Sequence, residues 1–172
     1  SKTDGPVKHE DMPMPLTHYG QSKLKAEYFI RKQTNVPFII IRPTAVYGPG
    51  ERDFFEAFKL INNHIEFFIG SAKQQLTFLY VKDLVRASIE LLESEQINRS
   101  YFISDGSVYN KKIFGRITSE ILNKKVLRIT VPLFLAKLIA LFSQHIAQLS
   151  MKVSVINLEK IKEFSARNWM CD

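Results

Sequence analysis

Tyr19 and Lys23 are the two side chains of this sequence that most directly suggest chemistry. They stand four residues apart in the stretch Thr17–Glu27, which reads as the start of a helix with Thr17 placed to cap its first turn. This spacing is about one helical turn, so the phenol and the ammonium share one face. A nearby cation favours the phenolate form, and such a tyrosine can take a proton from an alcohol or return one to a ketone. The pair therefore predicts acid/base chemistry, although any helix can carry it by chance.

The segments around this pair alternate between helical and β-rich patterns, which predicts an α/β fold. The helix from about His18 to Gln33 cannot continue beyond Pro37, because proline breaks a helix. The β-branched run Phe38–Arg42 is typical of a buried parallel strand. The turn residues Gly48–Gly50 follow it, where the carboxyl end of a parallel strand opens onto a ligand site.

The rest of the chain continues the alternation after a first segment, residues 1–16, that reads as an extended surface loop because of its glycine and prolines. The acidic residue Asp83 is expected to accept hydrogen bonds from the first-turn amides of its helix. By periodicity we expect helices over residues 53–63, 82–93, 111–122, 132–149 and 158–166, and strands over residues 66–69, 76–81, 101–103 and 126–131.

The composition is that of an ordinary globular protein and argues against a nucleic-acid-binding or membrane-spanning protein. The 172 residues are enough for one domain with a core, and 45% of them are hydrophobic. The formal charge of +7 comes from scattered basic residues rather than a basic stripe with interleaved aromatics, so nucleic-acid binding is not expected. The apolar run Val131–Phe142 is interrupted by Lys137 and is too short to span a bilayer, so no membrane partner is expected. The single cysteine, Cys171, and the polar opening without a signal peptide predict a cytoplasmic protein.

Three stretches together resemble the NAD-dependent epimerase/dehydratase family, the extended short-chain dehydrogenase/reductases. Tyr19–Glu27 resembles the active-site helix of that family, Arg42–Pro49 resembles its Arg-Pro-x-x-x-Tyr-Gly-Pro loop, and Phe78–Leu84 resembles its Phe-x-Tyr-Val-x-Asp-Val block. The late apolar helix and the terminal Asn168–Asp172 look like its small substrate-binding lobe. The resemblance covers most of the chain, but only the later half of such an enzyme.

The resemblance implies a partial Rossmann-like parallel sheet, made of the later strands, with a small α+β substrate-binding lobe. Residues 1–50 would hold the catalytic-helix part of the Rossmann-like domain, and residues 51–172 the remaining strands mixed with the lobe, in a single truncated unit. Tyr19 and Lys23 would be catalytic, and both would contact the cofactor, NAD or NADP, with Lys23 on the nicotinamide ribose. The residues bordering the nicotinamide would be Pro43, Thr44, Ala45 and Val46.

The implied activity is that of a sugar-nucleotide-epimerase/dehydratase-like oxidoreductase, which moves a hydride at a carbinol or ketone carbon while Tyr19 moves the proton. Its partner would be a small-molecule substrate, contacted by Arg52, Tyr80 and Arg99, and the intact enzyme would form a homo-oligomer. No metal ligands are expected.

Two departures from the family pattern bear on the substrate. Nucleotide-sugar members carry asparagine at the position of Ala45 and arginine at the position of Leu76, and both groups help to hold the sugar diphosphate. Their loss removes polar partners for a phosphate, which favours the sterol and flavonoid branch of the family. A non-catalytic dinucleotide-binding sensor or scaffold is a third interpretation, and the retained proton donor argues against it.

Two parts of such an enzyme are missing from the sequence. No Gly-rich turn joins a first strand to a helix, and Gly48–Gly50 cannot replace it because Pro49 stands where an amide should face phosphate. Only Ser1 and Thr3 precede Tyr19 at any distance as candidates for the catalytic Ser/Thr. The sequence therefore predicts a truncated later half that is inactive by itself.

Overall fold

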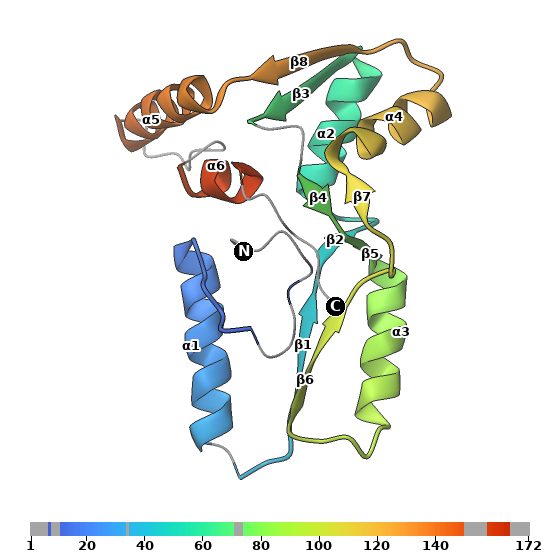
Figure 1. Ribbon diagram of the computed structural model, residues 1–172, viewed down its shortest axis with the longest axis vertical. Helices are drawn as coiled ribbons and strands as arrows, with labels where there is room; N and C mark the ends of the chain where they lie inside the picture. The colour runs from blue at the N-terminus through green and yellow to red at the C-terminus, as the bar shows by residue number, and fades with distance from the viewer. Residues whose placement is uncertain (1–6, 8–10, 34, 71–73, 150–157, 166–172) are drawn as a thin grey trace.

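The computed structural model describes residues 7, 11–33, 35–70, 74–149 and 158–165, which form a mixed α/β fold (Figure 1). Its helices are α1 His18–Gln33, α2 Arg52–Asn62, α3 Val81–Leu92, α4 Lys111–Ile121, α5 Leu133–Leu149 and α6 Leu158–Ser165. Its strands are β1 Ile39–Pro43, β2 Ala45–Tyr47, β3 Ile65–Ile69, β4 Gln75–Leu76, β5 Phe78–Tyr80, β6 Arg99–Ile103, β7 Tyr109–Asn110 and β8 Leu127–Val131.

Strand pairing is mainly parallel, which confirms the α/β prediction. The pairs β1–β6, β2–β5 and β3–β8 are parallel, whereas β4–β7 is antiparallel. In the β1–β6 pair the register runs from Ile39 opposite Arg99 to Pro43 opposite Ile103. Parallel strands need long crossover connections, and the helices supply them. In Figure 1, α1 and α3 stand on opposite sides of the β1–β6 pair.

A second group of elements, called the lobe here, consists of β3, β8, α2, α4, α5 and α6 and lies above the β1–β6 pair in Figure 1. Its core forms where α6 meets α5, through Ile161, Ala136 and Ala140, all of which are almost fully buried. Partly buried apolar residues of β3, β8 and the two helices pack against it: Ile69, Val131, Leu133 and Leu158. This core fixes α6 relative to the β3–β8 ribbon.

An aromatic cluster joins the lobe to the strand ends. Its rings are in contact at centroid distances of 5.3–6.4 Å, and they come from β2, β5, β7, α2 and α4. Ring pairs at these separations stabilise the fold beyond their buried area. The members are Tyr47, Phe54, Phe58, Phe78, Tyr80, Tyr109 and Phe114.

The β1 strand is less buried than its apolar sequence predicts. Ile39, Ile40 and Ile41 are only half-buried. Among the described residues β1 pairs with β6 alone, so its other edge remains open, and the flanking helices leave large apolar side chains such as Phe29 and Leu92 exposed. A strand buried on both faces needs more covering elements than these residues supply.

Two details of the sequence prediction were wrong. The β-rich run 76–81 is divided at Thr77 into β4 and β5, and α3 begins at Val81. Tyr80 is the N-cap of α3 and makes no side-chain cap hydrogen bond, so Asp83 does not cap this helix as predicted. Instead its carboxylate lies 3.7 Å from the guanidinium of Arg86, one turn along the same helix. Side-chain capping occurs elsewhere, at α4, where Asn110 accepts a hydrogen bond from the Lys112 amide at 2.8 Å.

Candidate active site

The first turn of α1 is held in place by its N-cap, as the sequence predicts. The Gly20 amide donates to Thr17 Oγ1 at 3.1 Å, and the Gln21 amide donates to the Thr17 carbonyl at 2.9 Å. Gly20 also allows the preceding loop to lie against the helix, because a Cβ there would come within 2.9 Å of the Pro15 Cβ. Tyr19 is therefore carried by a well-anchored turn.

The structure brings Tyr19 and Lys23 together. The Lys23 ammonium lies 5.4 Å from the centroid of the Tyr19 ring, and the tyrosine is 65% exposed. A cation over a ring at this distance contributes about 0.5–1 kcal/mol at an exposed site. The pair is thus in contact and open to a ligand.

The same helix carries a second such pair, Tyr28 and Lys32, with identical spacing. Lys32 Nζ lies 4.6 Å from the Tyr28 ring centroid, and Tyr28 is 60% exposed. Contact between the two side chains therefore does not distinguish a catalytic pair. What distinguishes the first pair is that Tyr19 lies in the capped first turn of α1 and that Glu27 follows Lys23 by one turn.

Glu27 follows Lys23 by one turn and ties α1 to β1. Arg42 donates to its two carboxylate oxygens, from Nε at 2.9 Å and from Nη2 at 2.5 Å, and both side chains are mostly buried. The hydrogen bond to Glu27 raises the pKa of Arg42 above its usual range. Sequence reasoning missed this pair, although an acid one turn beyond Lys23 and an arginine just before Pro43 were visible signals.

The chain leaving β1 forms the next part of the site. Pro43 is the exposed last residue of β1, and the Thr44 amide donates to the Ile103 carbonyl at 3.0 Å. Ala45 and Val46 lie half-buried in β2, opposite Phe78 and Leu79 of β5. This loop therefore meets the carboxyl ends of β5 and β6, the usual ligand edge of a parallel sheet.

Thr44 offers a test of whether a cofactor fits here. Its hydroxyl oxygen is buried and has no hydrogen-bond partner within the described part of the chain. Leaving a buried hydroxyl unpaired costs about 1–3 kcal/mol. A polar ligand atom at this position would remove that cost, so the loop fits the nicotinamide half of a dinucleotide.

Gly48 has a structural reason to be glycine. Its φ is +145°, and a Cβ there would lie 2.5 Å from Val81 Cγ1 at the start of α3. The close approach packs the turn against α3.

The three residues predicted to contact substrate lie in different places. Tyr80 ends β5, and its ring stands 5.4 Å from that of Tyr47 in the aromatic cluster. Arg52 is exposed at the first residue of α2, just after the Gly48 turn. Arg99 is the first residue of β6, at the opposite end of that strand from Thr44, so the structure does not bring it to this group. The serine and threonine candidates Ser1 and Thr3 lie outside the described residues.

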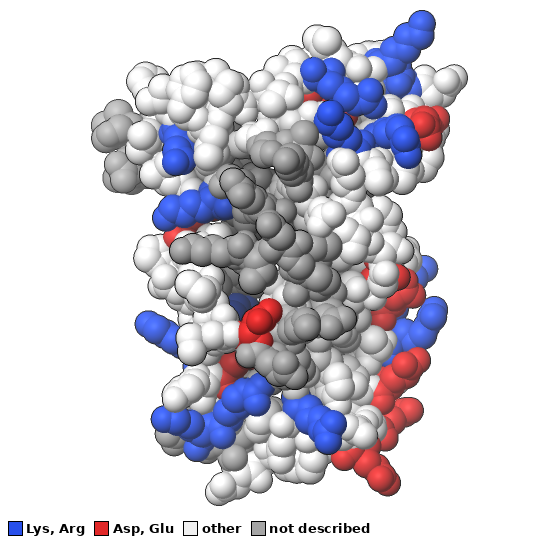
Figure 2. All heavy atoms as spheres, viewed as in Figure 1, with Lys and Arg blue, Asp and Glu red and all other residues white. Residues whose placement is uncertain are grey.

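Charge is unevenly distributed over the visible face. Figure 2 shows acidic groups gathered at the lower right, beside α3, and basic groups at the lower left, beside α1. Basic residues of α1 include Lys23, Lys25, Arg31 and Lys32, against one acid, Glu27. Such a field favours an anionic ligand on the α1 side.

Neither a metal site nor a membrane span is found in the part of the chain that the structure describes. No group of three or more His, Cys, Asp or Glu side chains there could hold a metal ion. No helix there is long and apolar enough to cross a bilayer.

Comparison with known proteins identifies the family. The sequence pattern of the NAD dependent epimerase/dehydratase family matches residues 1–104. The chain belongs to this family. Among its curated members, the UDP-glucose 4-epimerase of Vibrio cholerae is 30% identical over 77% of this chain and 42% of its own length. The dTDP-4-dehydro-6-deoxyglucose reductase of Escherichia coli is 33% identical over 72% of this chain and 42% of its own length.

Solved structures agree on the fold. The UDP-glucuronic acid 4-epimerase of Bacillus cereus in complex with NAD superposes with a TM-score of 0.68 at 24% identity, over 76% of this chain and 46% of that one. The Rossmann-like fold expected of the family is thus confirmed. The chain spans less than half the length of each of these three relatives.

Proposed function

We propose that the complete protein is an NAD(P)-dependent oxidoreductase of the sugar-nucleotide epimerase/dehydratase type and that this chain supplies its later half. The observation that carries the proposal is the exposed Tyr19–Lys23 pair, on a helix anchored to β1 through Glu27 and Arg42. The sugar-nucleotide relatives and the NAD in the Bacillus cereus enzyme support the cofactor and the reaction class.

In this proposal the nicotinamide, when bound, would accept a hydride from the carbinol carbon of the substrate or return it to the ketone carbon. Tyr19 takes the hydroxyl proton as the hydride leaves and returns it when the ketone is reduced. Lys23 stabilises the phenolate and binds the ribose hydroxyls. The Thr44 hydroxyl would pair with a polar atom of the nicotinamide half, and Pro43, Ala45 and Val46 would border the ring.

On the substrate side we propose Arg52 and Tyr80 as contacts. Arg52 is an exposed cation at the start of α2, and it can pair with a phosphate of a sugar nucleotide. Tyr80 presents an aromatic ring beside Tyr47 at the end of β5.

A second candidate is a dehydrogenase of the sterol or flavonoid type. Two apolar residues favour it: Ala45, half-buried against β5, and Leu76, which pairs with Tyr109 between β4 and β7. Neither side chain can donate a hydrogen bond to a diphosphate. Turnover of UDP- or dTDP-sugars against turnover of an uncharged hydroxy-steroid or flavonoid separates the two candidates.

The test uses the complete enzyme and follows nicotinamide absorbance. Tyr19→Phe is expected to lower kcat about 100- to 1,000-fold, a usual contribution of an acid/base group, with cofactor affinity retained. Tyr28→Phe is the matched control, since Tyr28 has its own lysine one turn away, and it should keep wild-type kcat. Equal activity of the two variants would refute the role of Tyr19.

A further inference from the structure

Helix α6 contacts the first turn of the helix that carries Tyr19. The His18 amide, one residue before Tyr19, donates a hydrogen bond to Glu159 Oε1 at 3.1 Å. The residues lie 141 positions apart in the sequence, so a late helix supplies the acceptor for one of the free amides that begin α1. Thr17 supplies the acceptor for the Gly20 amide.

Glu159 is held in place by the lobe. Leu158 and Ile161 of the same helix pack into the core formed by α5 and the β3–β8 ribbon, and Ile161 is 2% exposed. These two apolar neighbours fix α6, so the Glu159 carboxylate reaches α1 from the lobe side. In Figure 1, α6 lies directly above the N-terminal end of α1.

Glu159 contacts both the backbone amide and the imidazole of His18, and the contact with the backbone amide is the more important. Its carboxylate also lies 3.6 Å from His18 Nε2, but that imidazole is 88% exposed. An ion pair so open to water contributes little. A carboxylate on a first-turn amide, by contrast, both satisfies a backbone donor and complements the positive end of the helix dipole.

We propose that Glu159 is a positioning residue for Tyr19. Through the His18 amide it fastens the first turn of α1 to the lobe, so that the phenol is held in its working place only while α6 is docked. This inference rests on the proposed acid/base role of Tyr19. It makes catalysis depend on a residue of the lobe that lies far from Tyr19 in sequence.

The experiment uses the complete enzyme with hydrogen exchange at residues 18–21 and steady-state kinetics. Glu159→Ala should speed exchange of the His18 amide about tenfold, in line with the loss of a helix cap, and lower kcat about three- to tenfold while the KM for cofactor stays within about twofold. Glu159→Gln keeps an oxygen acceptor and should restore both values. His18→Ala keeps the amide and should resemble wild type.

A control variant, Glu120→Ala, removes an exposed acid from α4 and should change neither quantity. Unchanged exchange in Glu159→Ala would overturn the contact, whether or not Tyr19 proves to be the acid/base. Faster exchange with unchanged kcat would overturn the positioning role alone. The positioning role would also be overturned if Glu159→Gln lowered kcat as much as Glu159→Ala does. A similar fall in kcat in His18→Ala would overturn it too.

Discussion

Arg42 holds Glu27 through two hydrogen bonds, at 2.9 Å and 2.5 Å, and this pair sets where the Tyr19 helix lies against β1. The two side chains are 22% and 18% exposed, so the pair is mostly withdrawn from water. Removing one partner of such a pair leaves a partly buried charge without its counterpart, which costs more than the loss of a surface contact.

Arg42→Met should therefore lower the free energy of unfolding by about 1–3 kcal/mol, because Glu27 would keep a partly buried charge without its guanidinium. Arg42→Lys should retain only part of the stability that Arg42→Met loses, since an ammonium cannot form the bidentate pair that a guanidinium forms with a carboxylate. Glu56→Gln, which breaks the exposed Glu56–Lys59 pair, is the control and should change stability by less than about 0.5 kcal/mol. Urea unfolding of the complete protein measures all three. An Arg42→Met variant as stable as wild type would contradict the prediction.

Lys23→Met is expected to weaken cofactor binding and slow turnover, because it removes both the proposed ribose contact and the charge beside the Tyr19 ring. The loss of a charged hydrogen bond corresponds to about a tenfold or larger fall in affinity. Lys32→Met removes the equivalent cation from the Tyr28 pair and is the matched control. Calorimetric titration with NAD and NADP reads the affinity. If both methionine variants bound cofactor alike, Lys23 would be an ordinary surface lysine.

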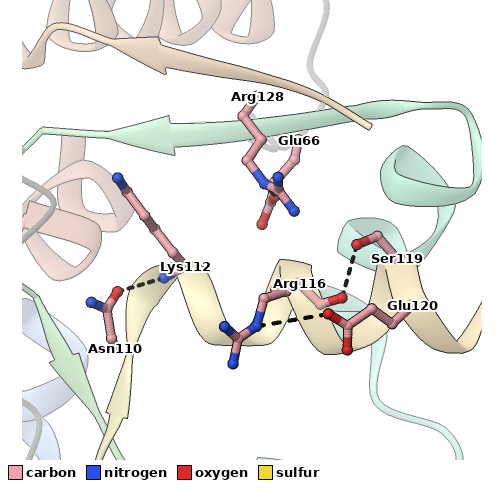
Figure 3. A network of polar contacts seen from close by, with 7 residues as sticks. All are labelled: Glu66, Asn110, Lys112, Arg116, Ser119, Glu120 and Arg128. Atoms are coloured by element: carbon pink, nitrogen blue, oxygen red, sulfur yellow. Dashed lines mark hydrogen bonds and ion pairs between the residues drawn. The ribbon is translucent and has the colours of Figure 1, made fainter. Parts of the chain in front are cut away.

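Glu66 should make stability depend on pH in the acidic range. Its side chain is buried at 8% exposure and pairs with Arg128 at 3.1 Å above α4 (Figure 3). Burial raises the pKa of Glu66, and the hydrogen bond and charge of Arg128 offset only part of that rise. The native state then binds more protons than the unfolded state between the two pKa values, so stability falls as pH rises from the ordinary glutamate value through the raised one.

Glu66→Gln cannot titrate and should flatten this part of the stability–pH curve. The measurement is urea unfolding in steps from about pH 4 to pH 7, around the ordinary glutamate value. Glu120→Gln, at an exposed site on α4, should leave the curve as it is in wild type. If the free energy of unfolding of the wild-type protein rose with pH over the same range, the raised pKa of Glu66 could not explain the dependence.

Gly115 lies against Glu66 in the middle of α4. A Cβ at residue 115 would come within 1.5 Å of Glu66 Oε1, so only glycine leaves room for the carboxylate. Gly115→Ala should destabilise the protein by about 1–3 kcal/mol through overpacking, although alanine favours helices over glycine. Adding Glu66→Ala should reverse much of the loss, because the clash then disappears. A stabilising Gly115→Ala, measured by thermal unfolding, would show that Glu66 moves aside freely.

The sequence predicts local features of this fold well and long-range contacts poorly. The bounds of α1 follow from Thr17 and Pro37, and the parallel character of β1 follows from its isoleucines. The short strands β2 and β7 were missed, because two or three residues carry too little periodicity to be recognised. The Tyr19–Lys23 contact was predictable because both residues lie on one helix.

Contacts between distant segments carry no such signal. His18 and Glu159 meet only because the lobe core docks α6 over α1, and nothing near either residue indicates this. Likewise the Glu66 carboxylate has room only because residue 115 is a glycine. This requirement becomes visible only when β3 is seen packed against α4. The sequence also carries no sign that Arg99, predicted to contact substrate, lies at the end of β6 away from Thr44.

The last prediction concerns this 172-residue chain by itself. Helix α5 buries its small residues, Ala136 and Ala140, and exposes large ones: Phe134 is 67% and Phe142 is 73% exposed. The edge of β1 that has no partner strand among the described residues can also serve as a template for pairing. Apolar surface of this kind promotes association, so the isolated chain should form dimers or larger species at tens of micromolar.

Sedimentation velocity tests this association, and the Phe134→Ser/Phe142→Ser double variant should shift the distribution towards monomer. The isolated chain should also bind neither NAD nor NADP measurably by calorimetry, because no Gly-rich turn in its sequence can hold the pyrophosphate. A clean monomer would contradict the role of the exposed faces. Micromolar dinucleotide binding would show that Thr44, Lys23 and their neighbours hold the cofactor without a pyrophosphate loop. The proposal that this chain supplies only the later half of the enzyme, without its pyrophosphate site, would then fail.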